Sequence, residues 1–297
     1  MTEQSLEKEN KTSLSVWARI VLIIISYFIL AGIFQFVGGL IVNIPLTNLN
    51  AFKNISINQL LILELCSFTA LVIVIYRFRT SIDKKTILSM GFSFKNRVND
   101  IIAGFIIALS IIGGGSLILY VLAYINFSDT QIDIQTLLLS LFLFTIVSLN
   151  EEILLRGYIL NNLLTSMNKY LALTISALIF MLMHVFNFNL SLIAFLNLFL
   201  AGLLLGSTYI FTKNLWFPLS LHLFWNFLQG PILGYSVSGR KIDSLFSLEI
   251  IGNNYINGGE FGFEGSILCS ILTIISVLLI LLYYNRPTPI IASSKSG

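Results

Sequence analysis

Long apolar stretches recur along this chain and constrain its fold more than any other feature. A helix needs about 20 mostly apolar residues to cross the hydrocarbon core of a bilayer. We identify about eight stretches that meet or approach this length, at roughly 17–42, 58–77, 101–125, 136–162, 170–187, 190–212, 215–230 and 266–284. Only 10% of the residues are charged, whereas a soluble domain has about 25%. The sequence therefore predicts an all-α, polytopic protein of the cell membrane, with its helices in one bundle.

The placement of lysine and arginine predicts how this bundle is oriented. If the chain crosses the membrane eight times, thirteen of these residues fall on one side and three on the other, with Arg156 inside a span. Cytoplasmic segments of membrane proteins carry an excess of lysine and arginine. We therefore expect both termini in the cytoplasm, with a tail at 1–16, a transmembrane domain at 17–285 and a second tail at 286–297.

Several other features limit the fold and the possible partners. The net charge of +3 is too small to indicate a nucleic-acid partner, and we find no soluble domain. The loop at 231–265 is rich in glycine and asparagine and lacks a helical period, so we expect it to be irregular. Three glycines at 113–115 predict a weak or bent point in the third span. Gly202 and Gly206 predict a close approach between helices inside the bundle.

Three ionisable side chains interrupt the fourth apolar stretch, in the segment NEEILLRG at 150–157. A charged side chain near the centre of a bilayer costs about 2.5–3.5 kcal/mol on insertion scales. Glu152 and Arg156 are four residues apart, on one helix face, and are expected to form an ion pair. Glu151 points about 100° away from that face and is left without a cation on its own helix. We take these two glutamates to be the only carboxylates within the spans.

The chain has only two histidines, and both fall in nearby predicted spans. His184 is in the fifth span and His222 in the seventh, where Asn226 follows four residues later. Counting about 1.5 Å per residue along each helix places Glu151 and both histidines between the midplane and the inner half of the bilayer. We therefore expect these side chains to converge on one wet pocket that faces the cell interior. There, Glu151 and His184 would activate water, and His222 and Asn226 would stabilise the oxyanion of a scissile carbonyl.

This pattern resembles the CPBP family of intramembrane proteases, which includes the type II CAAX prenyl proteases and bacterial Abi-type proteins. The family signature is EExxxR, then FxxxH, then HxxxN or HxxxB, on successive membrane helices. The chain has all three motifs in this order, as Glu151-Glu152 with Arg156, Phe180 with His184, and His222 with Asn226. The resemblance covers about residues 135–230, which we take as the protease core.

The resemblance implies a role for each motif residue. Glu151 is implied to be the catalytic glutamate, His184 its partner on the water, His222 and Asn226 the transition-state stabilisers, and Glu152 with Arg156 the supporting pair. It also implies an endopeptidase that acts near the C-terminus of a membrane-associated protein or peptide, in a site open toward the cytoplasm.

Four alternatives remain open from the sequence. The family is often described as metalloproteases, and Glu151, His184 and His222 could supply the three protein ligands of a catalytic zinc or another divalent metal. The HExxH pair of common zinc proteases is missing, so we favour hydrolysis driven by glutamate without a cofactor. A proton-coupled transporter would also concentrate glutamate and histidine within the membrane, but it predicts inverted repeats. Helix packing alone would not require the isolated Glu151. A non-enzymatic membrane immunity protein is disfavoured because the three motifs are intact.

Overall fold

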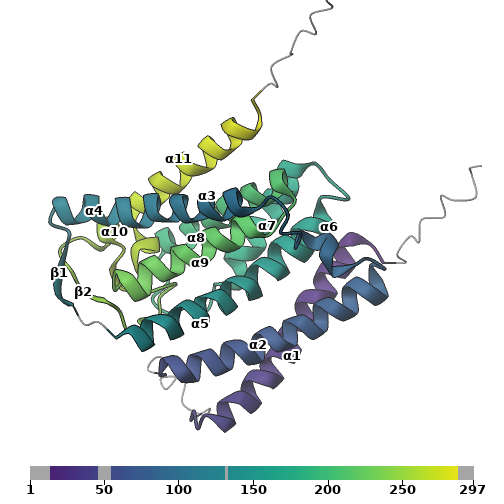
Figure 1. Ribbon diagram of the computed structural model, residues 1–297, viewed down its shortest axis with the longest axis horizontal. Helices are drawn as coiled ribbons and strands as arrows, with labels where there is room; N and C mark the ends of the chain where they lie inside the picture. Colours follow the sequence, from purple (N-terminus) through teal and green to yellow (C-terminus); the bar gives the residue numbers. More distant parts are fainter. Residues whose placement is uncertain (1–13, 46–54, 131–132, 287–297) are drawn as a thin grey trace, which may run out of the picture.

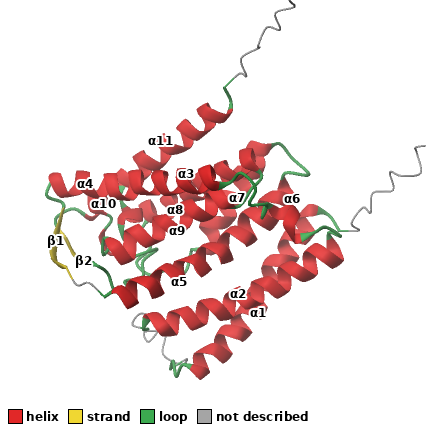
Figure 2. Ribbon diagram, in the orientation of Figure 1, coloured by secondary structure: helices red, strands yellow, loops and turns green. Residues whose placement is uncertain are grey.

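The computed structural model describes residues 14–45, 55–130 and 133–286, which form a bundle of long helices with one small sheet at one end (Figures 1 and 2). The tails predicted at 1–16 and 286–297 lie almost wholly outside the described residues. The prediction of an all-α, polytopic membrane protein is confirmed: six segments of the described chain are long and apolar enough to cross a membrane. These segments are Val16–Ile41, Ile57–Ile82, Val98–Val121, Ile134–Leu163, Leu192–Thr212 and Ile267–Tyr284.

The fifth and seventh predicted spans are helical but shorter than a full crossing. α7 (Lys169–Met183) has 15 residues, and α9 (Trp216–Phe227) has 12 before it continues as the five-residue π-helix η7 (Leu228–Ile232). Most residues of α9 are buried by neighbouring helices. An apolar stretch marks a buried helix as well as a spanning one, so the predicted number of about eight exceeds the six segments of spanning length.

α1 (Val16–Ile41) and α2 (Ile57–Arg77) form an antiparallel pair along one side of the bundle (Figure 1). α2 starts with a capping box, in which Ser56 and Gln59 satisfy each other's backbone N–H groups. It ends in the π-helix η3 (Phe78–Ile82). α2 also packs on α5, so it joins α1 to the rest of the molecule.

The central helices hold the sequence motifs. α5 (Ile134–Glu152) continues as the π-helix η6 (Ile153–Leu160) and the short α6 (Asn161–Leu163). α7 packs along α8 (Leu192–Thr212), and α9 contacts both α5 and α8. The predicted close approach within the bundle is found here, because a Cβ atom on Gly202 would lie 2.8 Å from Cα of Ala177 in α7.

The third predicted span has the expected weak point. It consists of α3 (Val98–Ala108), the π-helix η5 (Leu109–Gly113) and α4 (Gly114–Val121), so the regular α-helical hydrogen bonding is interrupted in the turn that ends at the first of the three glycines. α3 packs on α9, and α11 (Ile267–Tyr284) packs on α8.

The 231–265 segment is more ordered than predicted. It contains the strand β2 (Phe246–Ile250), the helical turn α10 (Asn254–Asn257) and two 3-10 turns, η8 (Gly259–Phe261) and η9 (Phe263–Gly265). β2 pairs antiparallel with β1 (Ile125–Thr130). The lack of a helical period correctly excluded a long helix, but the partner strand lies more than a hundred residues away and gives no local signal.

The two ends of the bundle differ. α1 begins and α11 ends at the same end as the 78–97 connection, which includes the 3-10 helix η4 (Ile87–Met90) and many of the lysines and arginines. A hydrogen bond of 2.7 Å between Arg19 and Asp83 joins α1 to that connection. We call this the basic end, and we call the opposite end, with β1, β2 and residues 231–265, the loop end (Figure 1).

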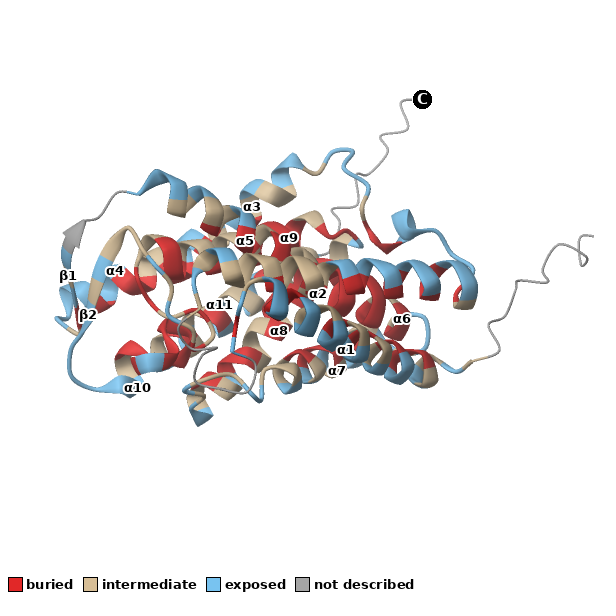
Figure 3. Cartoon of the chain, turned by 90° about the horizontal axis from the view of Figure 1, so that it is seen from below, coloured by how far each residue is buried: buried red, intermediate tan, exposed pale blue. Residues whose placement is uncertain are grey.

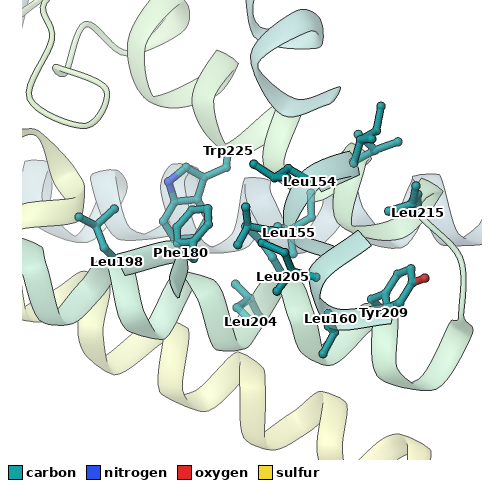
Figure 4. Packing of buried hydrophobic residues seen from close by; sticks show 14 of the residues in the cluster. Leu154, Leu155, Leu160, Phe180, Leu198, Leu204, Leu205, Tyr209, Leu215 and Trp225 are labelled. Carbon is teal, nitrogen blue, oxygen red and sulfur yellow. The ribbon is translucent and has the colours of Figure 1, made fainter. Parts of the chain in front are cut away.

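Buried residues run through the middle of the bundle (Figure 3). All eight residues of η6 are buried, including Arg156. Figure 4 shows part of the surrounding apolar cluster, with Leu154 and Leu155 of η6, Leu205 of α8 and Leu215. This packing fills the bundle between the glutamate pair and the basic end.

Candidate active site

Glu152 is a fully buried carboxylate with two cationic or polar partners. Its Oε1 accepts a hydrogen bond from Arg156 at 2.7 Å, as the helical spacing predicted. The same atom lies 2.8 Å from Nδ1 of His222, a contact that the sequence did not predict. Arg156 also donates to the carbonyl oxygen of Gly202 at 3.2 Å. Glu152 therefore ties α5 to α9, and Arg156 ties η6 to α8.

Glu151 points elsewhere and meets both histidines. Its Oε2 lies 3.8 Å from Nε2 of His184 and 3.9 Å from Nε2 of His222. These separations are too long for direct hydrogen bonds, and among the described residues this oxygen has no hydrogen-bond partner. The Oε2 atom itself is buried, whereas the side chain as a whole is 25% exposed and lines the cavity beside it. The structure thus brings together three predicted site residues from three helices.

Hydrogen bonds on the far side of each imidazole fix its orientation. Nδ1 of His184, which follows the last residue of α7, lies 2.7 Å from the carbonyl oxygen of Phe180. A carbonyl oxygen can only accept, so this nitrogen carries the hydrogen, and Nε2 of neutral His184 turns its lone pair toward Glu151. Nδ1 of His222 likewise donates to the Glu152 carboxylate, which leaves Nε2 directed at Glu151.

Asn226 shares the cavity wall with these groups. It lies one helical turn after His222 in α9 and is 4% exposed. Glu151, His184, His222 and Asn226 all line the same cavity. All four residues that were predicted to do chemistry therefore face one space.

Phe180, the aromatic residue of the FxxxH motif, lies among the site residues. Its ring centroid is 4.8 Å from Cζ of Arg156 and 4.6 Å from the His184 ring. The His222 ring packs edge-on at 6.3 Å. Phe180 belongs to the buried apolar cluster, together with Trp225 of α9 (Figure 4). It thus separates the buried ion pair from the cavity and holds both imidazoles in place.

The side chains of Glu151, His184 and His222 lie somewhat farther apart than the ligands of a bound zinc ion. No group of three His, Cys, Asp or Glu side chains in the described parts of the chain is arranged to hold a metal ion. Ligand atoms about 2.0–2.2 Å from a tetrahedral zinc lie closer together than the 3.8 and 3.9 Å that separate Glu151 from the two imidazoles. We therefore derive no step through a metal.

The cavity beside Glu151 has a volume of about 510 Å³. Its walls are mainly apolar and aromatic, with Phe28 of α1, Phe144 of α5 and Phe186 after α7 among them. Polar groups gather around Glu151 and near the 237–242 segment. A space of this size admits a stretch of peptide with its side chains.

The cavity does not extend in the predicted direction. We expected a pocket that faces the cell interior, which is the basic end if the lysine and arginine placement sets the orientation. Instead its lining includes Gln35, Leu60 and residues 237–242, all toward the loop end. Counting residues along a helix gives the depth of a side chain but not the direction in which its pocket opens. The packed η6 segment closes the direction of the basic end.

The structure adds functional candidates that the sequence analysis missed. Glu64 of α2 lines the cavity, so Glu151 and Glu152 are not the only carboxylates within the spans. Its position inside the apolar 58–77 stretch was enough to identify Glu64 from the sequence as a carboxylate within a span. Glu264 also lines the cavity, and it accepts hydrogen bonds from Trp225 Nε1 at 3.0 Å and from the Ser238 backbone N–H at 2.8 Å. It fastens the loop to α9 next to Asn226, a contact without a local sequence signal.

Comparisons with known proteins agree with the motif pattern. Residues 133–228 match the family described as type II CAAX prenyl endopeptidase Rce1-like. The matched range contains every predicted site residue, from Glu151 to Asn226. No curated protein matches the chain. The predicted resemblance is thus confirmed: the match to this protease family covers residues 133–228 of a multi-pass membrane protein.

Proposed function

We propose that the protein hydrolyses peptide bonds of membrane-associated proteins or peptides within the cell membrane, with Glu151 as general base. The observation that carries this proposal is the position of Glu151 Oε2, 3.8 and 3.9 Å from two imidazole nitrogens on the wall of one cavity. At separations of this size, a water molecule can bridge a carboxylate oxygen and an imidazole nitrogen. The family match supports a CAAX protease-like intramembrane endopeptidase in general terms.

The first step is the attack of water on the scissile carbonyl. The water donates one hydrogen bond to Glu151 and one to Nε2 of His184, which leaves a lone pair for the carbonyl carbon. As the new C–O bond forms, Glu151 takes the proton, and it later returns this proton to the leaving amine nitrogen when the C–N bond breaks. No serine or cysteine nucleophile is needed.

The second requirement is stabilisation of the oxyanion, which we assign to His222 and Asn226. The amide of Asn226 can donate directly. His222 donates from Nε2 only when its ring carries both protons, and the Glu152 carboxylate, 2.8 Å from Nδ1, stabilises that cation. A single donor of this kind contributes about 2.7–4 kcal/mol in known oxyanion holes.

We favour the metal-free form of this mechanism, and a divalent metal held by Glu151, His184 and His222 is the alternative. If the mechanism needs no metal, purified protein should contain less than one equivalent of divalent metal. It should also cleave peptides equally well before and after chelation. Loss of cleavage on chelation, with recovery when zinc is restored, would favour the metalloprotease.

Membrane proteomes of cells that produce wild-type protein or Glu151→Gln test the function itself. We expect new peptide C-termini in membrane proteins only with the wild type. The control is Glu249→Gln, which makes the same change at an exposed residue of β2 and should give the wild-type pattern. If the two glutamine variants and the wild type give the same C-termini, the protein is not this protease.

A further inference from the structure

Three polar side chains form a buried triangle beside Glu151. Asn150 Nδ2 lies 2.8 Å from the hydroxyl oxygen of Tyr27 and 3.1 Å from that of Ser67. The two hydroxyl groups are 2.8 Å apart. The side chains come from α5, α1 and α2, and all three line the cavity.

The number of hydrogens in this triangle fixes the orientation of the Asn150 amide. Three contacts need three hydrogens. With Nδ2 in the triangle, the amide supplies two hydrogens and one hydroxyl supplies the third. With the amide reversed, its oxygen supplies none, and the two hydroxyls cannot serve all three contacts. The nitrogen therefore faces Tyr27 and Ser67, and Oδ1 faces away from them.

Oδ1 of Asn150 is consequently an acceptor without a protein partner among the described residues, on a residue that lines the cavity. It is buried, and no hydrogen-bond partner for it is found in the part of the chain that the structure describes. Buried acceptors without partners are rare in native proteins because the desolvation cost is not recovered. Asn150 itself is 6% exposed and directly precedes Glu151. A ligand that meets this acceptor has to be a hydrogen-bond donor, and it would lie next to Glu151.

We propose that Oδ1 of Asn150 accepts a backbone N–H of the substrate and so fixes the peptide alongside Glu151. This inference rests on the proposed function and adds a positioning residue to it. A peptide in an extended conformation presents an N–H group at each residue whatever its side chains are, so Asn150 sets the register of the scissile bond and leaves side-chain selection to the apolar cavity walls. Tyr27 and Ser67 act through Asn150, because they hold its amide in place.

Replacing single peptide bonds of the substrate by esters tests this inference, since an ester lacks the N–H group. The probe is a farnesylated, internally quenched peptide that the wild-type protein cleaves in liposomes, with ester variants at each bond near the cleavage site. We expect one ester to lower kcat/KM by about tenfold with wild-type protein, the effect of one lost hydrogen bond. With Asn150→Leu, the same ester should change kcat/KM by less than twofold, because the Oδ1 atom that accepts the substrate N–H group is already absent.

Asn161→Leu is the matched control. It also removes an asparagine that donates to a tyrosine hydroxyl, Tyr209 at 2.8 Å, but Asn161 does not line the cavity. This variant should keep the wild-type response to every ester. Peptide affinity is measured in the Glu151→Gln background as well. There, Asn150→Leu should weaken binding of the all-amide peptide and leave binding of the ester peptide unchanged.

The outcomes separate this inference from the proposed function. An equal ester penalty in wild-type and Asn150→Leu proteins overturns the role of Asn150, while Glu151-dependent cleavage leaves the protease function intact. Cleavage by Glu151→Gln at the wild-type rate overturns the function instead.

Discussion

Two carboxylates, that of Asp83 buried at the basic end and that of Glu151 beside the cavity, have opposite environments. Asp83 at the basic end accepts hydrogen bonds from Arg19 at 2.7 Å and from Arg79 at 3.2 Å, and the hydroxyl of Tyr158 lies 3.4 Å away. Glu151 Oε2, in contrast, faces two imidazoles at distances that leave room for a third molecule. A buried carboxylate that is paired with two guanidinium groups stabilises one arrangement of helices. An acceptor left without a protein partner beside a cavity instead indicates a group that acts on a ligand.

Removing the Asp83 charge should have the largest effect on stability. Asp83→Asn leaves two buried guanidinium groups without a counter-ion, and we expect a loss of about 3–5 kcal/mol in the free energy of unfolding. Thermal unfolding in detergent measures this loss. The molecules that remain folded should cleave at the wild-type rate, because Asp83 lies outside the cavity.

The control for this variant is Asp100→Asn. The Arg97–Asp100 pair is partly exposed, at 30% and 17%, and should contribute less than about 1 kcal/mol. Equal stability of Asp83→Asn and Asp100→Asn would mean that the buried cluster does not hold the basic end together.

Glu152 is buried and paired with an arginine, as Asp83 is, and it also contacts His222 in the candidate active site. Its substitution should therefore have an intermediate effect on stability. Glu152→Gln weakens the hydrogen bonds to Arg156 and His222, and hydrogen bonds to charged groups contribute about 1.5–3 kcal/mol. We expect a loss of stability in this range, with a drop of about tenfold in cleavage per folded molecule, because His222 loses the carboxylate that supports its cation. Unchanged stability together with a thousandfold loss of cleavage would instead place Glu152 in the reaction itself.

The contact between α7 and α8 offers the smallest and most local test. Gly202→Ala adds a Cβ atom 2.8 Å from Cα of Ala177, and overpacking of this kind costs about 1–3 kcal/mol. Because α7 also holds His184, cleavage should fall in parallel with stability. Gly32→Ala, at a position with no atom within 4 Å, should change neither, and an equal loss from both variants would contradict close packing as the cause.

The helical class, and the meeting of the motif residues in one place, could be predicted from the sequence because both depend on local or motif-level signals. Apolar stretches mark helices, and the spacing of Glu152 and Arg156 fixes their pairing on one helix face. The convergence of Glu151 with His184 and His222 was predicted from motif order and approximate depth, and the distances agree with it.

Features that depend on tertiary packing could not be predicted in this way. The direction of the cavity depends on which end of the bundle is filled, and a count of residues per helix carries no such information. The Asn150, Tyr27 and Ser67 triangle joins three helices, and each of these residues alone is an ordinary polar residue in an apolar stretch. The β1–β2 pairing likewise joins segments far apart in the chain.

The rate of peptide cleavage by purified Glu151→Gln protein in liposomes tests the central claim most directly. Glutamine keeps the size of the side chain but cannot take a proton from water. We predict that cleavage falls by at least about a hundredfold, the lower range for loss of a general base, with unchanged thermal unfolding and with Glu249→Gln at the wild-type rate. Cleavage by Glu151→Gln at the wild-type rate would contradict the account.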